Sequence, residues 1–238
     1  MPSIKLIRRS LTALLLPVTL ASALVLGIGA GPAMAWTSAP AACTYADVLT
    51  PHRAYADWKL SLLDTHYRLS STYYPVDLVG TGISGGGYVR SLVYSDLHAL
   101  ASAAKAAGAP IAIQSAFRSY TNQVATFNYW VSVDGYAAAL KVSARPGHSE
   151  HQLGTAIDFK SYGGSAPWNS SDWATTKAGA WMKANAWRYG FIMSYPKYQF
   201  AKTCYAYEPW HYRYVGRTEA SSVHYSGLVL RYWLWRVQ

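Results

Sequence analysis

The segment GHSEHQLGTAIDF, residues 147–159, decides both the expected fold and the expected chemistry of this chain. Its second half, residues 155–159, alternates small or polar with apolar side chains, which predicts a short, half-buried β-strand. Gly154 lets the backbone bend just before that strand. Asp158 then lies on a strand built for burial, where a carboxylate must be paired, hydrogen-bonded or bound to a metal ion. His151, across the bend, is a candidate ligand of the same ion.

Helices and strands surround this segment without a regular order. Periodicity and turn residues predict helices over residues 50–69, 91–107, 122–133, 136–142 and 172–187, and strands over residues 111–115, 191–195 and 207–215. The loop of residues 73–87 is rich in glycine but lacks the Lys-Ser/Thr ending of a phosphate-binding loop, so we interpret it as a turn. Residues 228–237 are aromatic and apolar, and we expect them to pack on the core. We predict a single α+β domain with a small central, mainly antiparallel sheet flanked by helices.

The N-terminus has the features of a cleaved secretory signal peptide. A basic start (Lys5, Arg8 and Arg9) precedes an apolar run over residues 11–29, and residues 33–35 form a small-x-small cleavage site. We therefore expect residues 1–35 to be removed and residues 36–238 to form the mature domain, outside the cytoplasm. An uncleaved membrane anchor is the competing interpretation, and the cleavage triplet argues against it.

The composition narrows the class of partner. The chain has a formal net charge of +10, with 10 Trp and 20 Tyr. An exported, basic and aromatic-rich protein suits an anionic, carbohydrate-bearing surface such as a cell wall, although a charge that mainly aids solubility is the simpler alternative. No Lys/Arg run marks a nucleic-acid site, so we expect no nucleic-acid partner. We also expect a monomer with no stable membrane span after cleavage of the leader.

The two cysteines, Cys43 and Cys204, both lie in the predicted mature domain. An even number of cysteines in an oxidising compartment favours a disulfide. Their wide separation argues against a metal site, because thiolate ligands usually come in closely spaced pairs. We therefore predict that Cys43 and Cys204 form a disulfide.

A second polar motif completes a candidate metal site. Residues 208–211 read Glu-Pro-Trp-His, and two imidazoles with one carboxylate suit a catalytic zinc ion that keeps a fourth position open for water. His151, Asp158 and His211 supply that set. Attack by the water still needs a base beside it, and Glu208 is the candidate. Pro209 prevents a regular helix between Glu208 and His211, so a turn or a strand entry must aim both side chains inward.

Three motifs in this sequence resemble those of one enzyme family. Residues 149–158 match the pattern S-x-H-x-x-G-x-A-x-D, residues 208–211 match E-x-W-H, and residues 115–123 match S-x-x-R-x-x-x-x-Q. In this order the motifs resemble those of the VanY-type zinc D-alanyl-D-alanine carboxypeptidases, a peptidase M15-like family. A single motif is weak evidence, whereas three in the family's order are strong evidence.

The resemblance implies a role for each matching residue. It implies that His151, Asp158 and His211 bind one zinc ion and that Glu208 acts as general base and acid. It also implies a small α+β domain with a central antiparallel sheet, which agrees with the fold class predicted above.

The same resemblance implies how a substrate is held. Arg118 matches the residue that binds the carboxylate of a terminal D-alanine, with help from a serine that matches Ser149. An arginine fork fits a carboxylate in a bidentate manner, which agrees with that role. Gln123 either orients Arg118 or holds the peptide carbonyl, and Ser115 completes the set of candidate substrate-binding residues.

Some neighbours of these residues have simpler interpretations. We interpret His148 as loop packing or support for the site, since the family pattern does not use it as a ligand. We expect Glu150 to be exposed to solvent, because it points away from its neighbour His151 in an extended segment. We expect Trp210 to wedge the strand that carries His211.

The leading hypothesis is a secreted zinc DD-carboxypeptidase that removes the terminal D-alanine from peptidoglycan stem peptides. An endopeptidase on the same scaffold is an alternative that would not need Arg118 to meet a free carboxylate. A cell-wall binding module without hydrolysis is the alternative from another class. Glu208 argues against that module, since a binding protein has no use for a base beside the metal.

Overall fold

The structure, a computed structural model, describes Pro40 and residues 42–237. The predicted signal peptide and its cleavage site lie outside these residues. Within the described part of the chain, no helix combines the length and the apolar character needed to cross a membrane.

The described residues contain short strands and mostly short helices. The strands are β1 (Val48–Leu49), β2 (Tyr67–Arg68), β3 (Leu78–Gly80), β4 (Tyr88–Arg90), β5 (Ile111–Ser115), β6 (Ala156–Ser161), β7 (Phe191–Met193) and β8 (His211–Tyr214). The helices are α1 (Tyr94–Ala106), α2 (Tyr120–Asp134), α3 (Tyr136–Val142), α4 (Lys177–Asn185), α5 (Phe200–Thr203), α6 (Arg217–Ser226) and α7 (Leu230–Val237). Single turns of 3₁₀ helix lie between them, of which Glu150–Leu153 matters most for the site.

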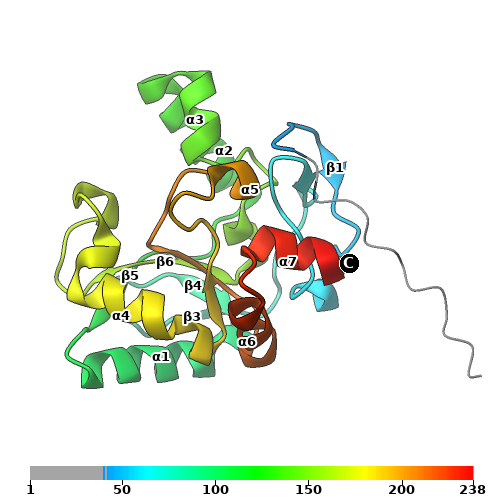
Figure 1. The fold of residues 1–238 in the computed structure, drawn as a ribbon. Coiled ribbons are helices and arrows are strands. Elements are labelled where there is room, and N and C mark those ends of the chain that lie inside the picture. Colours follow the sequence, from blue (N-terminus) through cyan, green and yellow to red (C-terminus); the bar gives the residue numbers. More distant parts are fainter. Residues whose placement is uncertain (1–39, 41, 238) are drawn as a thin grey trace, which may run out of the picture. The chain divides into compact units, whose positions relative to one another are not determined.

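A four-stranded sheet with the order β5-β6-β8-β7 forms the centre of the domain, and each of its neighbouring strands runs antiparallel. Helices α1 and α4 lie along one face of it (Figure 1). Because side chains alternate between the faces of a strand, Phe159 and Tyr212 enter the core on that face. Asp158 and His211 therefore point to the opposite face. The predicted α+β fold with a mainly antiparallel sheet is confirmed.

The C-terminal helices close a second apolar cluster on the domain. Trp233 and Leu234 of α7 pack there with Val223 of α6 and with Leu62 from the N-terminal part of the chain. The prediction that residues 228–237 pack on a core is confirmed. Helix α6 was not predicted, because its polar residues hide the few apolar positions that face inward.

The predicted helix over residues 50–69 is wrong. That segment forms one 3₁₀ turn (Tyr55–Asp57) and otherwise irregular chain, up to β2. The carboxylate of Asp64 accepts hydrogen bonds from the backbone N–H groups of His66 and Tyr67, at 2.8 and 2.7 Å. An aspartate that bonds to its own following backbone offers a turn in place of a helix. Aromatic spacing alone could not reveal this competition.

The predicted helix over residues 172–187 is shorter in the structure. Only α4 is α-helical there, with a 3₁₀ turn on each side. The Thr176 hydroxyl accepts a hydrogen bond from the N–H of Gly179, and a threonine in this position caps the start of a helix. The capping threonine therefore sets a later start than the apolar pattern predicts.

The glycine-rich part of the predicted loop, residues 81–87, is a turn between β3 and β4, but the loop predicted over residues 73–87 also contains β3 itself, which was not predicted. Gly85 has a φ of +96°, and a Cβ atom there would lie 1.9 Å from the carbonyl oxygen of Ile113 on β5. Only glycine permits that approach. The turn therefore packs directly on the edge strand of the central sheet.

Candidate active site

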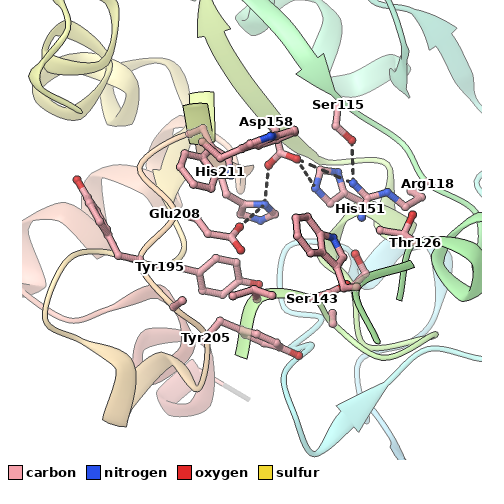
Figure 2. A pocket seen from close by; sticks show the side chains of 18 residues that line it. Ser115, Arg118, Thr126, Ser143, His151, Asp158, Tyr195, Tyr205, Glu208 and His211 are labelled. Atoms are coloured by element: carbon pink, nitrogen blue, oxygen red, sulfur yellow. Dashed lines mark hydrogen bonds and ion pairs between the residues drawn. The ribbon is translucent and has the colours of Figure 1, made fainter. Parts of the chain in front are cut away.

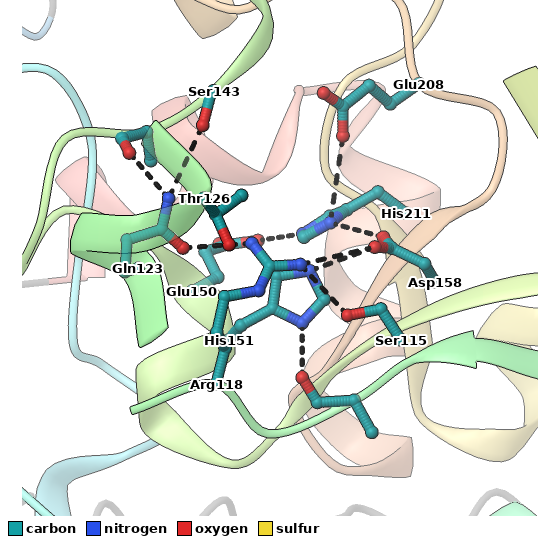
Figure 3. Close-up of polar contacts among 12 residues, drawn as sticks. Ser115, Arg118, Gln123, Thr126, Ser143, Glu150, His151, Asp158, Glu208 and His211 are labelled. Carbon is teal, nitrogen blue, oxygen red and sulfur yellow. Dashed lines mark hydrogen bonds and ion pairs between the residues drawn. The ribbon is translucent and has the colours of Figure 1, made fainter. Parts of the chain in front are cut away.

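Three buried side chains meet on the open face of the central sheet. His151, Asp158 and His211 place one potential ligand atom each within 4.8 Å of the others. The two oxygens of Asp158 lie 3.2 Å from His151 Nε2 and 3.0 Å from His211 Nδ1 (Figure 3). The residues that the sequence predicted as metal ligands are therefore brought together.

Strand pairing and one turn produce this arrangement. Asp158 on β6 lies directly opposite His211 on β8 in the antiparallel register, so their side chains share a face. His151 belongs to the 3₁₀ turn Glu150–Leu153, which ends at Gly154 with a φ of +73°. The left-handed glycine reverses the chain into β6, as the sequence predicted.

Hydrogen bonds assign the tautomer of His151. Its Nδ1 lies 2.7 Å from the carbonyl oxygen of Ala116, which can only accept, so this nitrogen carries the hydrogen. The lone pair of Nε2 then faces the carboxylate of Asp158. Two electron-pair donors that face each other in a buried site require a cation between them.

His211 leads to the same requirement. Burial opposes its charge, but hydrogen bonds to Asp158 and Glu150 outweigh burial and raise the pKa of His211 to about 10. In the metal-free site, a proton thus supplies the positive charge that the donors demand. Two imidazole nitrogens and a carboxylate oxygen are a donor set that fits zinc.

Glu208 lies in the turn before β8, next to the candidate ligands. Its N–H donates to the carbonyl of Tyr195 at 3.1 Å, and the N–H of His211 donates to the carbonyl of Glu208 at 3.1 Å. Glu208 Oε2 lies 3.8 Å from His211 Nδ1. Burial raises the pKa of Glu208 to about 8. The prediction of a strand over residues 207–215 is too long, because β8 begins only at His211.

Arg118 extends from the loop after β5 into the same site. Its Nη1 donates to Gln123 Oε1 and its Nη2 donates to Ser115 Oγ, both at 2.9 Å. Nη2 also lies 4.0 Å from Asp158 Oδ2. Of the two roles predicted for Gln123, the structure shows the orientation of Arg118. Ser115 likewise contacts Arg118.

A cavity of about 330 Å³ opens over these groups. Figure 2 shows Glu208, Arg118 and the candidate ligands facing it. Ser149 also lines it, while aromatic side chains form much of the remaining wall: Trp130, Trp168, Tyr195, Tyr205, Tyr207 and Trp210. Trp210 packs partly on the core, and its ring also meets that of Trp168 edge to face.

The prediction that Glu150 is exposed is wrong. Only 4% of the residue is accessible, and its carboxylate contacts His211, Ser194 and Arg213. The segment is a 3₁₀ turn and not an extended strand, so Glu150 and His151 can both face inward. The sequence signal for this role was Arg213, two residues after His211 and therefore on the same face of β8.

Two other predictions near the site agree with the structure. His148 is buried in loop packing, with Nδ1 at 2.7 Å from the carbonyl of Asp64 and Nε2 at 3.0 Å from Asp47. Cys43 and Cys204 form the predicted disulfide. The bond joins the N-terminal segment to the residues that lead into Tyr205 and Glu208.

An arginine that is held in a cavity beside a His–Asp–His set can bind a free carboxylate next to a metal-activated bond. This combination defines a metal-dependent carboxypeptidase.

Comparisons with known proteins identify the family. Residues 86–217 match the family model VanY, described as D-alanyl-D-alanine carboxypeptidase. The "Putative carboxypeptidase YodJ" of Bacillus subtilis (strain 168) is 36% identical over 186 residues, which cover 75% of this chain and 68% of that protein. The chain belongs to the VanY family of D-alanyl-D-alanine carboxypeptidases.

Solved structures agree with this assignment. The LdcB LD-carboxypeptidase, described with its peptidoglycan recognition, has a TM-score of 0.67 and 35% identity, with 74% of this chain and 85% of that chain covered. A D,D-pentapeptidase VanY from a VanB-type vancomycin resistance cassette, in complex with Zn(II), has a TM-score of 0.63 and 30% identity, with 74% and 99% covered. The names of these two neighbours give different specificities, LD for the first and D,D for the second.

Proposed function

We propose that this protein is a secreted, zinc-dependent DD-carboxypeptidase that hydrolyses the terminal D-Ala-D-Ala bond of peptidoglycan stem peptides. The observation that carries the proposal is the position of Arg118, held by Ser115 and Gln123 at 4.0 Å from the Asp158 carboxylate. A guanidinium that is fixed so close to the metal set can hold a C-terminal carboxylate one residue away from the bond that is cut.

Each side chain has a defined part in the proposed reaction. His151, Asp158 and His211 would hold a single zinc ion, which would supply Lewis acidity and lower the pKa of a water molecule. Glu208 takes the proton from that water on its carboxylate and passes it to the nitrogen of the leaving D-alanine. Burial raises the pKa of Glu208, and a nearby cation lowers it again, which brings the group toward the range needed for both steps.

Arg118 and Ser149 bind the substrate in this proposal. The guanidinium pairs with the terminal carboxylate, and the Ser149 hydroxyl donates a further hydrogen bond to it. The position of Ser149 in the wall of the same cavity as Arg118 supports this role. Ser115 and Gln123 keep the guanidinium plane in place, so less side-chain entropy is lost when the substrate binds.

The proposed location is the cell wall, outside the cytoplasm. It rests on the predicted leader over residues 1–35, with residues 36–238 as the mature, monomeric catalytic domain. The Cys43–Cys204 disulfide supports this location, because such bonds persist in oxidising compartments.

The proposal is tested by mass spectrometry of the products from a pentapeptide stem that ends in D-Ala-D-Ala. The matched control is the same peptide with an amidated C-terminus, and both are measured with and without a chelator. We expect loss of one alanine from the free acid only, and only without chelator. Cleavage of both peptides at an internal bond would show an endopeptidase and overturn the proposal.

The similarity to the LdcB LD-carboxypeptidase supports a second candidate, cleavage of a terminal D-residue from an L-residue. A tetrapeptide stem whose last bond joins an L-centre to D-alanine distinguishes the two candidates. Faster release of alanine from the tetrapeptide than from the pentapeptide would assign the LD specificity. The metal set, Glu208 and Arg118 would keep the same parts.

A further inference from the structure

A buried polar network lies behind His211, on the side away from the cavity. Glu150 Oε2 lies 2.9 Å from His211 Nε2 and accepts a hydrogen bond from Ser194 Oγ at 2.6 Å. Glu150 Oε1 accepts from Arg213 Nη1 at 3.1 Å, and Arg213 Nη2 donates to the carbonyl of Trp58 at 2.7 Å. Figure 3 shows Glu150 and Asp158 contacting His211 from different sides.

The charges in this network leave little freedom. Arg213 is 0% accessible and always charged, and it has no acceptor atom, so it requires an anion beside it. Glu150 meets this need through Oε1 and uses Oε2 for His211 and Ser194. A carboxylate at Oε2 can only accept, so His211 Nε2 must carry a hydrogen. Once the second ring proton of His211 is lost, the lone pair of the neutral ring lies on Nδ1, which faces Asp158 and Glu208.

We propose that Glu150 is a positioning residue of the metal centre. Its carboxylate holds His211 in the Nε2–H tautomer and in one ring orientation, so that Nδ1 presents its lone pair to the zinc ion. The inference rests on the proposed function for the presence of zinc, and it assigns a new role to Glu150. Carboxylates that support a metal-bound histidine in this way orient the ring and raise its basicity.

A purely structural ion pair between Glu150 and Arg213 is the simpler explanation. Such a pair would usually be bidentate, with both carboxylate oxygens on the guanidinium fork. Here Arg213 contacts only Oε1, through Nη1, while its Nη2 donates to the carbonyl of Trp58. One carboxylate oxygen of Glu150 therefore contacts Arg213, and the other contacts His211.

Glu150→Gln tests the role because it replaces one carboxylate oxygen by an amide nitrogen without changing the size of the side chain. The amide has one acceptor oxygen, and Arg213 requires it, since the guanidinium cannot face a donor. The amide NH₂ then faces His211 Nε2 and requires that nitrogen to accept. The hydrogen of the ring moves to Nδ1, which removes the lone pair from the metal side.

We expect Glu150→Gln to weaken zinc binding by about 10- to 100-fold, the range found when such supporting partners are lost. Zinc affinity is measured by competition with a chromophoric chelator, and folding by circular dichroism and thermal unfolding. Asp64→Asn is the matched control: Asp64 is also buried and pairs with Arg231 at 2.6 Å, and neither residue belongs to the proposed metal set or lines the cavity. It should lower the melting temperature and leave zinc affinity unchanged.

Two results would overturn the positioning role. The first is that Glu150→Gln binds zinc as tightly as the unmodified protein. The second is that Asp64→Asn weakens zinc binding as much as Glu150→Gln does. Both apply to a protein that binds zinc and cleaves the stem peptide. Failure of the unmodified protein to bind zinc would instead overturn the proposed function, and the inference with it.

A measurement on the unmodified protein covers the case in which Glu150→Gln does not fold. In zinc-loaded protein with ¹⁵N-labelled histidine, long-range ¹H–¹⁵N spectra distinguish the two ring nitrogens of His211. We expect a slowly exchanging hydrogen on Nε2 and the metal-bound shift on Nδ1. Zinc on Nε2 of His211 would overturn the proposal without any variant.

Discussion

His211 has a glutamate on each side, and the pKa values of the two carboxylates are shifted in opposite directions. Burial raises the pKa of Glu150, but the hydrogen bond from His211 and the charge of Arg213 outweigh it and lower the pKa to about 2. Glu208, on the cavity side, has its closest His211 nitrogen at 3.8 Å, and burial raises its pKa to about 8. Glu150, with a side chain 5% accessible, is thus a permanent anion behind the proposed metal site, whereas Glu208, with a side chain 18% accessible, is a proton carrier in front of it.

The comparison predicts different losses for the two glutamates. Glu208→Gln should reduce kcat by about 10²- to 10⁴-fold, because it removes general acid–base catalysis. Zinc affinity should fall far less than kcat, since Glu208 is not among the proposed ligands. The measurements are D-alanine release and zinc competition on the same preparation. A loss of zinc affinity in Glu208→Gln as large as the loss expected for Glu150→Gln would contradict the separate roles of the two glutamates.

Arg118 belongs to the cavity side, so its variants should affect the substrate and not the metal. Arg118→Lys keeps the charge but loses the two-nitrogen fork, and we expect kcat/KM to fall by about 10- to 100-fold, as for loss of one charge-assisted hydrogen bond. The matched control is Arg145→Lys, since Arg145 pairs with Asp47 outside the proposed substrate site. An equal loss of kcat/KM in both variants would contradict the assignment of Arg118 to the carboxylate.

Proton release on zinc binding tests the same comparison. In zinc-free protein, His211 and Glu208 have pKa values of about 10 and about 8, so both hold a proton at pH 7, whereas Glu150 is already ionised. Zinc requires His211 Nδ1 to be free, so binding at pH 7 should release protons. Zinc affinity should then rise about tenfold per pH unit for each proton released.

Calorimetry in buffers of different ionisation enthalpy counts these protons. Glu208→Gln should release fewer protons than the unmodified protein. The stability of the zinc-free fold should change with pH in the opposite direction to zinc affinity. The pKa of His211 is above its unfolded value, so its proton stabilises the zinc-free fold fully below about pH 6.5. This contribution is lost as the pH rises through about 10. A proton count of zero at pH 7 would exclude this account of the site.

The disulfide should have the smallest effect on the reaction. Cys204 precedes the segment that carries Glu208, while Glu150 lies on a separate turn. Replacing both cysteines by serine should lower the free energy of unfolding by about 2–4 kcal/mol, mainly because the unfolded chain regains freedom. Denaturant unfolding measures that change, and kcat/KM should stay close to its original value. A loss of activity as large as that of Glu208→Gln would show that the bond itself positions the cavity side.

The cavity side of the site was predictable because its residues form compact motifs. Asp158 and His151 could be placed by one alternating strand and one glycine bend, and both features exist as predicted. The prediction from Pro209 that no regular helix links Glu208 to His211 is confirmed. Such local patterns leave signals in the sequence because they act over a few residues.

The side behind His211 was not predictable in the same way. Glu150 becomes buried only because Arg213 and Ser194 arrive from β8 and from the end of β7. These contacts join residues 44 and 63 positions apart, so the two-residue spacing that places Arg213 on the face of His211 does not show that Glu150 meets it. The helix predicted over residues 50–69 failed for a related reason, since side-chain bonds to the backbone outweighed helix periodicity.

The direct pairing of Asp158 with His211 across β6 and β8 has a consequence for how the chain matures. A slip of the two strands by one residue would place Asp158 opposite Tyr212, whose side chain belongs to the other face of the sheet. Such a misfolded chain has no complete ligand set and cannot take up zinc. Binding of the proposed zinc ion would therefore favour the correctly paired molecules by mass action, because the slipped ones lack that stabilisation.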